Sequence, residues 1–386
     1  MTNQPQNNQF EDVCELLNRH GFEGMKNAMS VLINEAMRIE RENHLGAAAF
    51  ERSESRQGYA NGFKPKTVTT RLGKLQLQVP QTRETDFYPS ALEKGIRSER
   101  ALKVAIAEMY VQGVSTRKMA SITVELIGSE VTSMQVSRAA KELDEVLSAW
   151  RERQLSETPY LILDARYEKV RHGGRVIDCA VLVAVGISAS GHRSVLGCSV
   201  SLSEAETHWR EFMNSLVGRG LSGVRMIISD DHAGLKAARR AVFPAVPWQR
   251  CQFHLQQNAQ TYVPQQSMKV AVANDIRSIF QASDLDTANI ALKQFIARYE
   301  ETAPKLAEWA ENNLPEGLAV MKLPQNHRRL LRTTNMLERQ NKEIKRRTRV
   351  ATLFPNAESC LRLVSAVLME VSEGWETGRI YLTMSK

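Results

Sequence analysis

Apolar positions recur with two different periods along the chain, and the changes of period divide it into regions. From Phe10 to His44 they return every three or four residues, which predicts amphipathic helices interrupted at Gly21. Between Arg56 and Arg83 apolar and polar residues alternate on both sides of Gly73, which predicts a β-hairpin. From 100 to 153 the helical period returns, with glycine-containing turns between the helices.

The helices from 100 to 153 have the order of a helix-turn-helix. A first helix is followed by a Gly-Val-Ser turn, a short helix, and a further helix that opens at Thr132 or Ser133, residue types that favour N-caps. Helix pairs joined by a glycine turn are common in other folds, but in a helix-turn-helix the last helix enters the major groove. We expect four of its side chains to face DNA: Gln135, Ser137, Arg138 and Lys141.

Beyond Tyr160 the pattern changes to short apolar runs that predict a sheet. The first run ends at Asp164, and another, which follows a predicted crossover helix, ends at Asp230. The order from 160 to 248 is β-β-β-α-β-α-β, and a crossover helix makes the strands that it joins parallel. If the two strands are neighbours, both aspartates emerge at one sheet edge, where open α/β sheets bind ligands. A lone aspartate there could instead only cap a turn.

The rest of the chain is predicted to be helical. Residues 262–326 have helical spacing and no strand pattern, which indicates an all-α insertion, and two more helices are expected at 335–349 and 357–371. In chain order we expect an N-terminal helical segment for dimerisation or DNA binding, a basic hairpin, a helix-turn-helix, the first part of an α/β core, the insertion, and the last part of the core. Their boundaries are 1–46, 47–99, 100–153, 154–262, 263–325 and 326–386.

Composition excludes several classes of protein. With 386 residues, 42% hydrophobic and 24% charged, the chain suits a globular protein of roughly two to four domains. It has no run of about 18 apolar residues and no signal sequence, so we expect no membrane span and a cytoplasmic location. The five cysteines are scattered and form no Cys-x-x-Cys pair, which argues against a disulfide framework or a structural zinc site.

Basic residues are concentrated in two stretches. The net charge is +8; Arg56 to Arg83 holds six basic residues and no acidic one, and Arg328 to Arg349 holds nine basic and two acidic residues. A solvated basic face is one interpretation of the first stretch, but charge this one-sided favours a polyanion such as DNA. The side chains that we expect to contact phosphates are Arg71, Lys74, Arg339, Lys342, Lys345, Arg346 and Arg347.

Two glutamates in the second basic stretch are candidates for a third carboxylate beside the aspartates. Glu338 and Glu343 lie about 140° apart around a helix, so at most one of them can join the aspartates. Glu338 could instead complete a capping box and Glu343 could pair with an arginine four residues away, so helical geometry alone does not choose. Three converging carboxylates would suit two Mg²⁺ ions, for which Mn²⁺ could substitute, and phosphodiester chemistry.

Four strings in the chain closely resemble, in matching order, those of Mutator-like bacterial insertion-sequence transposases: Leu163–Arg171, Ser229–Leu235, Trp248–His254 and Thr334–Arg347. A fifth, Met109–Lys118, is similar to the helix-turn-helix entry of that family, and the resemblance extends from about Arg52 onward. It implies an α/β RNase H-like core of the retroviral-integrase type with an all-α insertion. A mainly α DNA-binding region, with a helix-turn-helix and a small β-hairpin, would precede that core.

The resemblance also implies the site residues. Asp164, Asp230 and Glu338 would be the catalytic residues and the Mg²⁺ ligands, because the glutamate of the family lies in an Asn-x-x-Glu-Arg string. The chain departs from the family at Asp231, where a small residue is usual, and the strand register favours Asp230. Four residues are expected to support the site: Cys251 and His254 of a Cys-x-x-His string, His232, and Trp248, which could also pack in the core or stack on a displaced base.

The activity that the resemblance implies is DNA transposition. A DDE transposase binds the terminal inverted repeats of its element and, with Mg²⁺, exposes a 3′-hydroxyl and transfers it to another DNA strand. The family further implies a homodimer, a copy-out, paste-in route, and association with the nucleoid. Two other classes fit the same residues: an RNase H-like nuclease without strand transfer, and a DNA-binding regulator whose core is not catalytic. Three carboxylates argue against the regulator, because DNA binding alone does not need negative charge facing the phosphates.

Overall fold

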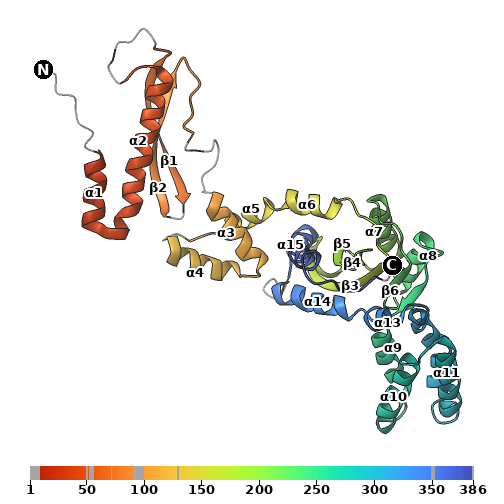
Figure 1. Ribbon diagram of the computed structural model, residues 1–386. Helices are drawn as coiled ribbons and strands as arrows, with labels where there is room; N and C mark the ends of the chain where they lie inside the picture. The colour runs from red at the N-terminus through yellow and green to blue at the C-terminus, as the bar shows by residue number, and fades with distance from the viewer. Residues whose placement is uncertain are drawn as a thin grey trace. The chain divides into compact units, whose positions relative to one another are not determined.

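The computed structural model describes residues 9–48, 51, 56–70, 72–90, 92, 100–127, 130–348 and 353–384 (Figure 1). These residues form two compact units. The first contains the described residues up to Tyr110 and those from Val114 to Glu142. The second contains Val111–Gly113 and the described residues from Leu143 onward.

The first unit begins with helices packed on a hairpin. The elements are α1 (Gln9–His20), the 3-10 turn η1 (Gly21–Gly24), α2 (Met25–Leu45), β1 (Tyr59–Thr70) and β2 (Gly73–Arg83). The predicted helix break at Gly21 and the antiparallel hairpin that turns at Gly73 are confirmed. Leu75 and Leu77 of β2 are buried against Met37 of α2, and the polar residues between them face outward, as the alternation requires.

Three further helices complete the first unit: α3 (Arg100–Val111), α4 (Thr116–Ile127) and α5 (Ser133–Lys141). Each of the last two begins at a side-chain cap: the Ser115 hydroxyl accepts from the backbone N–H of Lys118, and Thr132 forms a capping box with Gln135. Their apolar faces share a small core that includes Met119 and Val136. The predicted helices are confirmed, and their action as a helix-turn-helix stays a prediction.

The second unit is built on a mixed five-stranded sheet with the order β5-β4-β3-β6-β7. Strands β3, β4 and β5 pair antiparallel in chain order, and β3, β6 and β7 pair parallel, as the predicted β-β-β-α-β-α-β order requires. The strands and the helices between them are β3 (Tyr160–His172), β4 (Arg175–Ile187), β5 (Arg193–Ser201), α7 (Glu206–Gly218), β6 (Met226–Ser229), α8 (Ala233–Val242) and β7 (Trp248–Arg250).

The two faces of β3 pack against different helices. Leu161 and Leu163 point into the core made with α7 and α8. The alternate residues, from Tyr160 through Asp164, belong to the opposite face, which three C-terminal helices cover (Figure 1). These helices are α13 (Gln325–Leu331), α14 (Asn335–Thr348) and α15 (Ala357–Glu376).

One helix lies outside the segment in which the sequence analysis placed it. We drew a boundary at 153–154, but α6 (Asp144–Glu152) belongs to the second unit, which begins at Leu143. Asp144 accepts two hydrogen bonds from Arg362 of α15, and Arg151 donates to the hydroxyl of Ser365.

The segment between β7 and α13, all of which the structure describes, contains helices and the turns that join them and no strand, as the helical spacing of 262–326 predicts; its place as an insertion domain stays a prediction. It holds α9 (Gln252–Ala259), η2 (Gln260–Tyr262), η3 (Gln266–Met268), α10 (Lys269–Phe280), α11 (Leu285–Tyr299), α12 (Pro304–Asn313), η4 (Leu314–Gly317) and η5 (Ala319–Lys322). These helices bury a core of their own, with Ile276, Phe295 and Leu306 among its members. Within the described residues, no helix is long and apolar enough to cross a bilayer.

Candidate active site

The pairing of β3 with β6 brings two aspartates to the same level of the sheet. The parallel register joins Tyr160 to Met226 and Ile162 to Ile228, and it ends there. The same offset, continued by two residues, sets Asp164 beside Asp230. We expected β3 to end at Asp164, but it continues to His172 because β4 pairs with its whole length. The carboxylate nevertheless lies where the β6 side of the sheet stops.

Asp164 is half-buried and accepts a hydrogen bond on each carboxylate oxygen. Its Oδ1 accepts from the backbone N–H of Ala165 at 2.9 Å, and its Oδ2 accepts from Nδ2 of Asn341 at 2.8 Å. Burial raises the pKa of Asp164 to about 7, even though these hydrogen bonds favour the carboxylate. The negative charge of Asp164 is thus poorly compensated by the protein itself.

His254 of α9 connects the second aspartate to the basic helix. Its Nδ1 lies 2.8 Å from Oδ2 of Asp230, and its Nε2 lies 3.2 Å from Oε1 of Glu338. The hydrogen bond to Asp230 raises the pKa of His254 despite partial burial. Burial acts to raise the pKa of Asp230, but the hydrogen bond from His254, the backbone N–H of Asp231 and the nearby cations together outweigh it, and the pKa is lowered. Residues of β6, α9 and α14 are therefore joined through one imidazole.

Helix α14 supplies two site residues from one face. Glu338 and Asn341 are three positions apart, so both point toward the sheet, one to His254 and one to Asp164. Arg166, two residues along β3, donates to the backbone carbonyl of Asn341, and further along Thr348 donates to Glu168 at 3.2 Å. Successive residues on one face of β3 thus hold α14 along the strand.

The start of α14 is fixed by the Cys-x-x-His string. The Sγ atom of Cys251, which is fully buried, accepts hydrogen bonds from the backbone N–H and the hydroxyl of Thr334, each at 3.3 Å. Burial raises the pKa of this thiol, so it stays protonated and unreactive. Cys251 and His254 therefore hold the two ends of one turn of α9 against α14, which accounts for their spacing without a zinc ion.

The structure separates the two glutamates that helical geometry left open. The Glu338 carboxylate contacts His254 and lies beside the aspartates. Glu343 points away from them and pairs with Arg346 at 2.7 Å and Arg347 at 2.8 Å. Together these arginines hold the pKa of Glu343 at about 2, with Arg346 as the larger cause.

The two neighbouring aspartates are also separated. Asp231 lies 3.0 Å from Nζ of Lys236 and 3.0 Å from Nη1 of Arg250, and both cations also contact Glu316 of η4. Asp231 is therefore an ion-pair partner that joins the sheet to the insertion. Asp230 faces the other carboxylates, and its Oδ1 is buried without a hydrogen-bond partner.

Two predicted supporting residues lie beside these groups rather than among them. Nδ1 of His232 lies 3.2 Å from Oε1 of Glu204. Trp248 donates from Nε1 to the hydroxyl of Ser229 at 2.9 Å, and the cations of Lys236 and Arg239 lie over its ring at 4.9 and 5.3 Å. These contacts give Trp248 a packing role in the sheet, and a role in stacking on DNA stays a prediction.

The donor set fits hard divalent cations, although the side chains are not arranged around one. Among the described residues, no three acidic, histidine or cysteine side chains stand close enough to share a metal ion, and the imidazole of His254 lies between Asp230 and Glu338. The unpartnered Oδ1 of Asp230 and the buried carboxylate of Asp164 are oxygen donors that lack a cation. Holding one with all three carboxylates requires the imidazole to move.

The predicted DNA-contacting residues on α14 differ in exposure. Lys342, Lys345 and Arg346 are exposed, although Arg346 is paired with Glu343. Arg347 is only 5% exposed and pairs with both Glu343 and Glu370, and its contact with a phosphate stays a prediction. The side chain of Arg339 lies outside the described residues.

On α5 of the first unit, Ser137, Arg138 and Lys141 are exposed. Gln135 is half-buried and its side-chain oxygen accepts from the N–H and hydroxyl of Thr132 in the capping box, and its contact with DNA stays a prediction. Lys74 is exposed on β2, whereas Arg71 lies outside the described residues.

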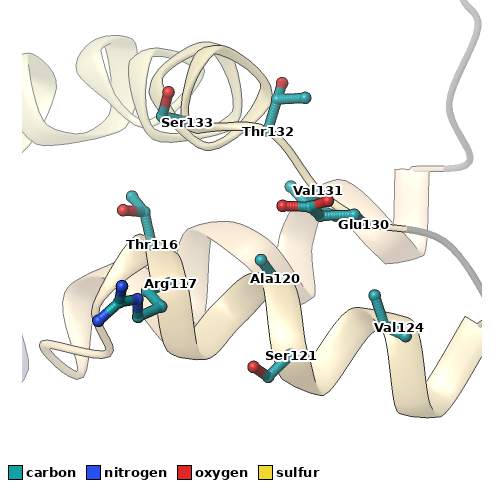
Figure 2. Close-up of a pocket in the computed structure, with 9 residues that line it drawn as sticks. All are labelled: Thr116, Arg117, Ala120, Ser121, Val124, Glu130, Val131, Thr132 and Ser133. Atoms are coloured by element: carbon teal, nitrogen blue, oxygen red, sulfur yellow. The ribbon is translucent and has the colours of Figure 1, made fainter.

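Figure 2 shows an open pocket of about 610 Å³ between α4 and the start of α5. The predicted groove-facing side chains of α5 do not line it. The pocket is lined by several hydroxyl groups, one cationic and one anionic side chain, and apolar residues. The lining residues are Thr116, Arg117, Ala120, Ser121, Val124, Glu130, Val131, Thr132 and Ser133.

Sequence reasoning missed Asn341 and Arg166 as parts of the site. The available signal for Asn341 was its spacing of three from Glu338, which places it on the same helical face. No comparable signal marked Arg166, because its partner is a backbone carbonyl.

Comparisons with known proteins define the class of this one. The model of the family "Transposase, Mutator family" matches residues 1–378. The transposase for insertion sequence element IS406 of Burkholderia multivorans is 58% identical over 380 residues, which cover 98% of each chain. The transposase for insertion sequence element IS256 in transposon Tn4001 of Staphylococcus aureus is 36% identical over 366 residues, 94% of this chain and 93% of that one.

The chain therefore belongs to the Mutator family of transposases, and the resemblance carried by its motifs is confirmed. Among solved structures, a chain of the simian T-cell lymphotropic virus intasome covers 53% of this chain, and 64% of that chain is covered in return. Its identity is 13% and its TM-score is 0.18, so it supports no conclusion about the fold.

Proposed function

We propose that this protein is a Mg²⁺-dependent DDE transposase of a bacterial insertion sequence, with an RNase H-like core. The observation that carries the proposal is the register of β3 and β6, which sets Asp164 beside Asp230, together with the link through His254 to Glu338. Membership of a transposase family and relatives named as insertion-sequence transposases support it.

In this proposal Asp164, Asp230 and Glu338 hold two Mg²⁺ ions. When bound, such ions activate the attacking oxygen and stabilise the leaving oxygen at phosphorus. Asn341 orients Asp164 through its 2.8 Å hydrogen bond, and His254 orients Asp230. Carboxylates that are already oriented lose little conformational entropy when the metal ions bind. Orienting the metal ligands in this way is the usual role of residues that hydrogen-bond to them.

The DNA partner follows from the same proposal. The exposed Lys342 and Lys345 of α14 would contact phosphates next to the cut, and Ser137, Arg138 and Lys141 of a helix-turn-helix would read the terminal inverted repeats. Binding through several phosphates should weaken steeply as salt increases. We further propose that the active form is a homodimer and that transposition follows the copy-out, paste-in route, both of which rest on the family alone.

One assay tests the function. Purified protein is incubated with Mg²⁺ and a labelled duplex that carries an inverted-repeat end and its flank, and the products are separated on a denaturing gel. Joined strands support the proposal. Nicking without joining would instead indicate an RNase H-like nuclease, and binding without any cut would indicate a regulator. Asp164→Ala should abolish nicking and joining while it leaves binding of the end unchanged.

A further inference from the structure

The β3–β4 hairpin extends beyond the rest of the sheet as a two-stranded ribbon. Pairing of β4 with β5 ends at Ala180, and pairing of β3 with β6 ends at Ile162, whereas β3 and β4 stay paired as far as His172 and Arg175. We call 168–179 the ribbon. Its Gly173-Gly174 loop has φ of +55° and +78°, the left-handed conformations of the tight turn that matches strand twist.

The ribbon is held firmly to the core at one edge. Phe354, which is 1% exposed, donates from its backbone N–H to the carbonyl of Lys169 and accepts from the N–H of Arg171, both at 2.9 Å. On the same strand Val170 is fully buried. The ribbon is therefore a fixed projection of the second unit and not a loose loop.

Cations dominate the exposed side chains of this projection. Lys169, Arg171 and Arg175 are exposed, and His172 is exposed beside them at the tip. In the part of the chain that the structure describes, no ion pair forms to any of the first three. Glu168 does not neutralise them, because it is engaged with Arg166 and Thr348, and the exposed Asp178, opposite Lys169, offsets only one of the three charges. Clustered cations without partners repel each other, so they favour a polyanion.

The ribbon extends β3 beyond the carboxylates and carries cations on both of its faces. Arg175, paired with His172, shares the face of Asp164, whereas Lys169 and Arg171 alternate with those residues and face the other side. Helix α14 runs along β3, since Asn341 contacts Asp164 and Thr348 contacts Glu168. Seven residues of helix span about 10 Å and four of strand span about 13 Å, so the two elements advance together. The exposed Lys342 and Lys345 of α14 occupy this interval, and the ribbon extends roughly another 13 Å beyond it.

We infer that the ribbon binds the phosphate backbone of the duplex that is being cut, about seven base pairs from the scissile phosphate. Arg171 is seven strand residues from Asp164, or roughly 23 Å, and duplex phosphates follow each other at about 3.4 Å along each strand. The donor duplex is the partner that fits, because it alone occupies the carboxylates in the first cut. The inference rests on the proposed function, which supplies the position of the scissile phosphate.

The first test removes the charge and measures salt dependence. A triple variant, Lys169→Ala, Arg171→Ala and Arg175→Ala, is compared with a control that loses three exposed cations elsewhere, Arg225→Ala, Lys293→Ala and Lys305→Ala. Binding is measured against salt on the inverted-repeat duplex with its flank and on unrelated target duplex. We expect the log–log slope for the donor duplex to fall by about 0.9 per lost phosphate contact, and so by roughly 2 to 3, in the ribbon variant alone.

The second test maps the position of the ribbon on DNA. Val176, which is 53% exposed on the ribbon, is changed to cysteine in a Cys14→Ser background and carries an iron-EDTA cleaving group. The other cysteines are buried, so the label is specific. We expect backbone cleavage centred about seven base pairs from the nick, on the element side or the flank side, and the side identifies which arm of the donor the ribbon follows.

The outcomes separate this inference from the function on which it rests. If the unmodified protein neither nicks nor joins DNA, the proposed function fails. If it does both, but the ribbon variant keeps the slope of the control, or only target binding changes, or the tethered group cuts nowhere within ten base pairs of the nick, the ribbon inference is overturned.

Discussion

Two adjacent residues, Asp230 and Asp231, follow the same strand and lie in opposite electrostatic situations. Around Asp231, two carboxylates meet two cations, since Lys236 and Arg250 each contact both Asp231 and Glu316. Around Asp230, two carboxylates, those of Asp230 and Glu338, share one imidazole, and one oxygen of Asp230 has no partner. Neighbouring acidic residues are therefore not equivalent. The number of cations that contact each carboxylate distinguishes a structural ion-pair cluster from a site that can still bind a cation.

The difference has a physical reason. Burying a carboxylate is unfavourable unless a cation or several hydrogen bonds compensate it. The Asp231 cluster meets that requirement and joins β7 to η4 through Arg250, which is 2% exposed. Asp164 does not meet it, since burial raises its pKa to about 7, and a divalent cation would supply the missing positive charge. Substitutions in the Asp231 cluster should act on stability, and those around Asp164 should act on chemistry.

The largest effect is expected for Asp164→Asn. The variant keeps the shape of the side chain but loses the charge that a cation needs, so nicking and joining should fall on the order of 10³-fold or more. Unfolding in urea should show no loss of stability, because a buried and poorly compensated carboxylate has been removed. If Asp164→Asn instead lost stability along with activity, the contrast between the Asp164 and Asp231 clusters would be contradicted.

Arg250→Met should show the converse. Asp231 and Glu316 lose one of their two shared cations, and Lys236 remains. We expect the free energy of unfolding to fall by about 3 kcal/mol, the lower end for a broken buried pair, because both acids keep Lys236 and some contact with water. The matched control is Arg210→Met, which breaks the exposed pair with Glu206 and should cost less than about 1 kcal/mol. Urea denaturation followed by circular dichroism measures both variants.

Asn341→Ala tests whether a residue that orients Asp164 affects metal binding. Asp164 would lose the hydrogen bond that orients it, and residues of this kind typically alter metal affinity or activity by about 10- to 100-fold. We expect weaker Mn²⁺ binding, counted by electron paramagnetic resonance, and a higher Mg²⁺ concentration for half-maximal nicking. Asn312→Ala, on the insertion, is the control. Equal Mn²⁺ binding by wild type and Asn341→Ala would show that Asn341 does not support metal binding.

The smallest effect concerns pH in the absence of divalent cations. The pKa of Asp164 is raised by burial from 3.8 to about 7, so the folded state binds this proton more tightly than the unfolded state. That contribution to stability is fully present below about 3.8 and is lost as pH rises through about 7. Relative to Asp164→Asn, the melting temperature of the wild type should therefore fall as pH rises across this window. Parallel curves would show that the carboxylate is not buried in solution.

Much of the fold could be read from the sequence because it depends on local periodicity. The helix break at Gly21, the hairpin turn at Gly73 and the crossover that makes β3 and β6 parallel are all confirmed. The extent of β3 was wrong, because the end of a strand depends on how far its neighbour stays paired, and β4 stays paired to His172. The end of an apolar run marks where one neighbouring strand ends, and not where the strand itself ends.

Side-chain partners were harder to predict, because they come from distant parts of the chain. Arg347 lies in a string of basic residues, yet it is buried by Glu370 of the next helix. The side-chain oxygen of Gln135 accepts from the N-cap residue of its own helix. The bridge of His254 from Asp230 to Glu338 joins three elements, and a spacing pattern within one element cannot contain it.

The sequence by itself determined the family, the elements and the two aspartates, because apolar period, turn residues and short motifs are local properties of the chain. Only the tertiary structure decided which cations each of these carboxylates meets. It places His254 beside Asp230 and Glu338, and it pairs Asp231 with Arg250 and Glu343 with Arg347. The reason is that electrostatic balance depends on distances of a few ångströms between residues that lie far apart in sequence.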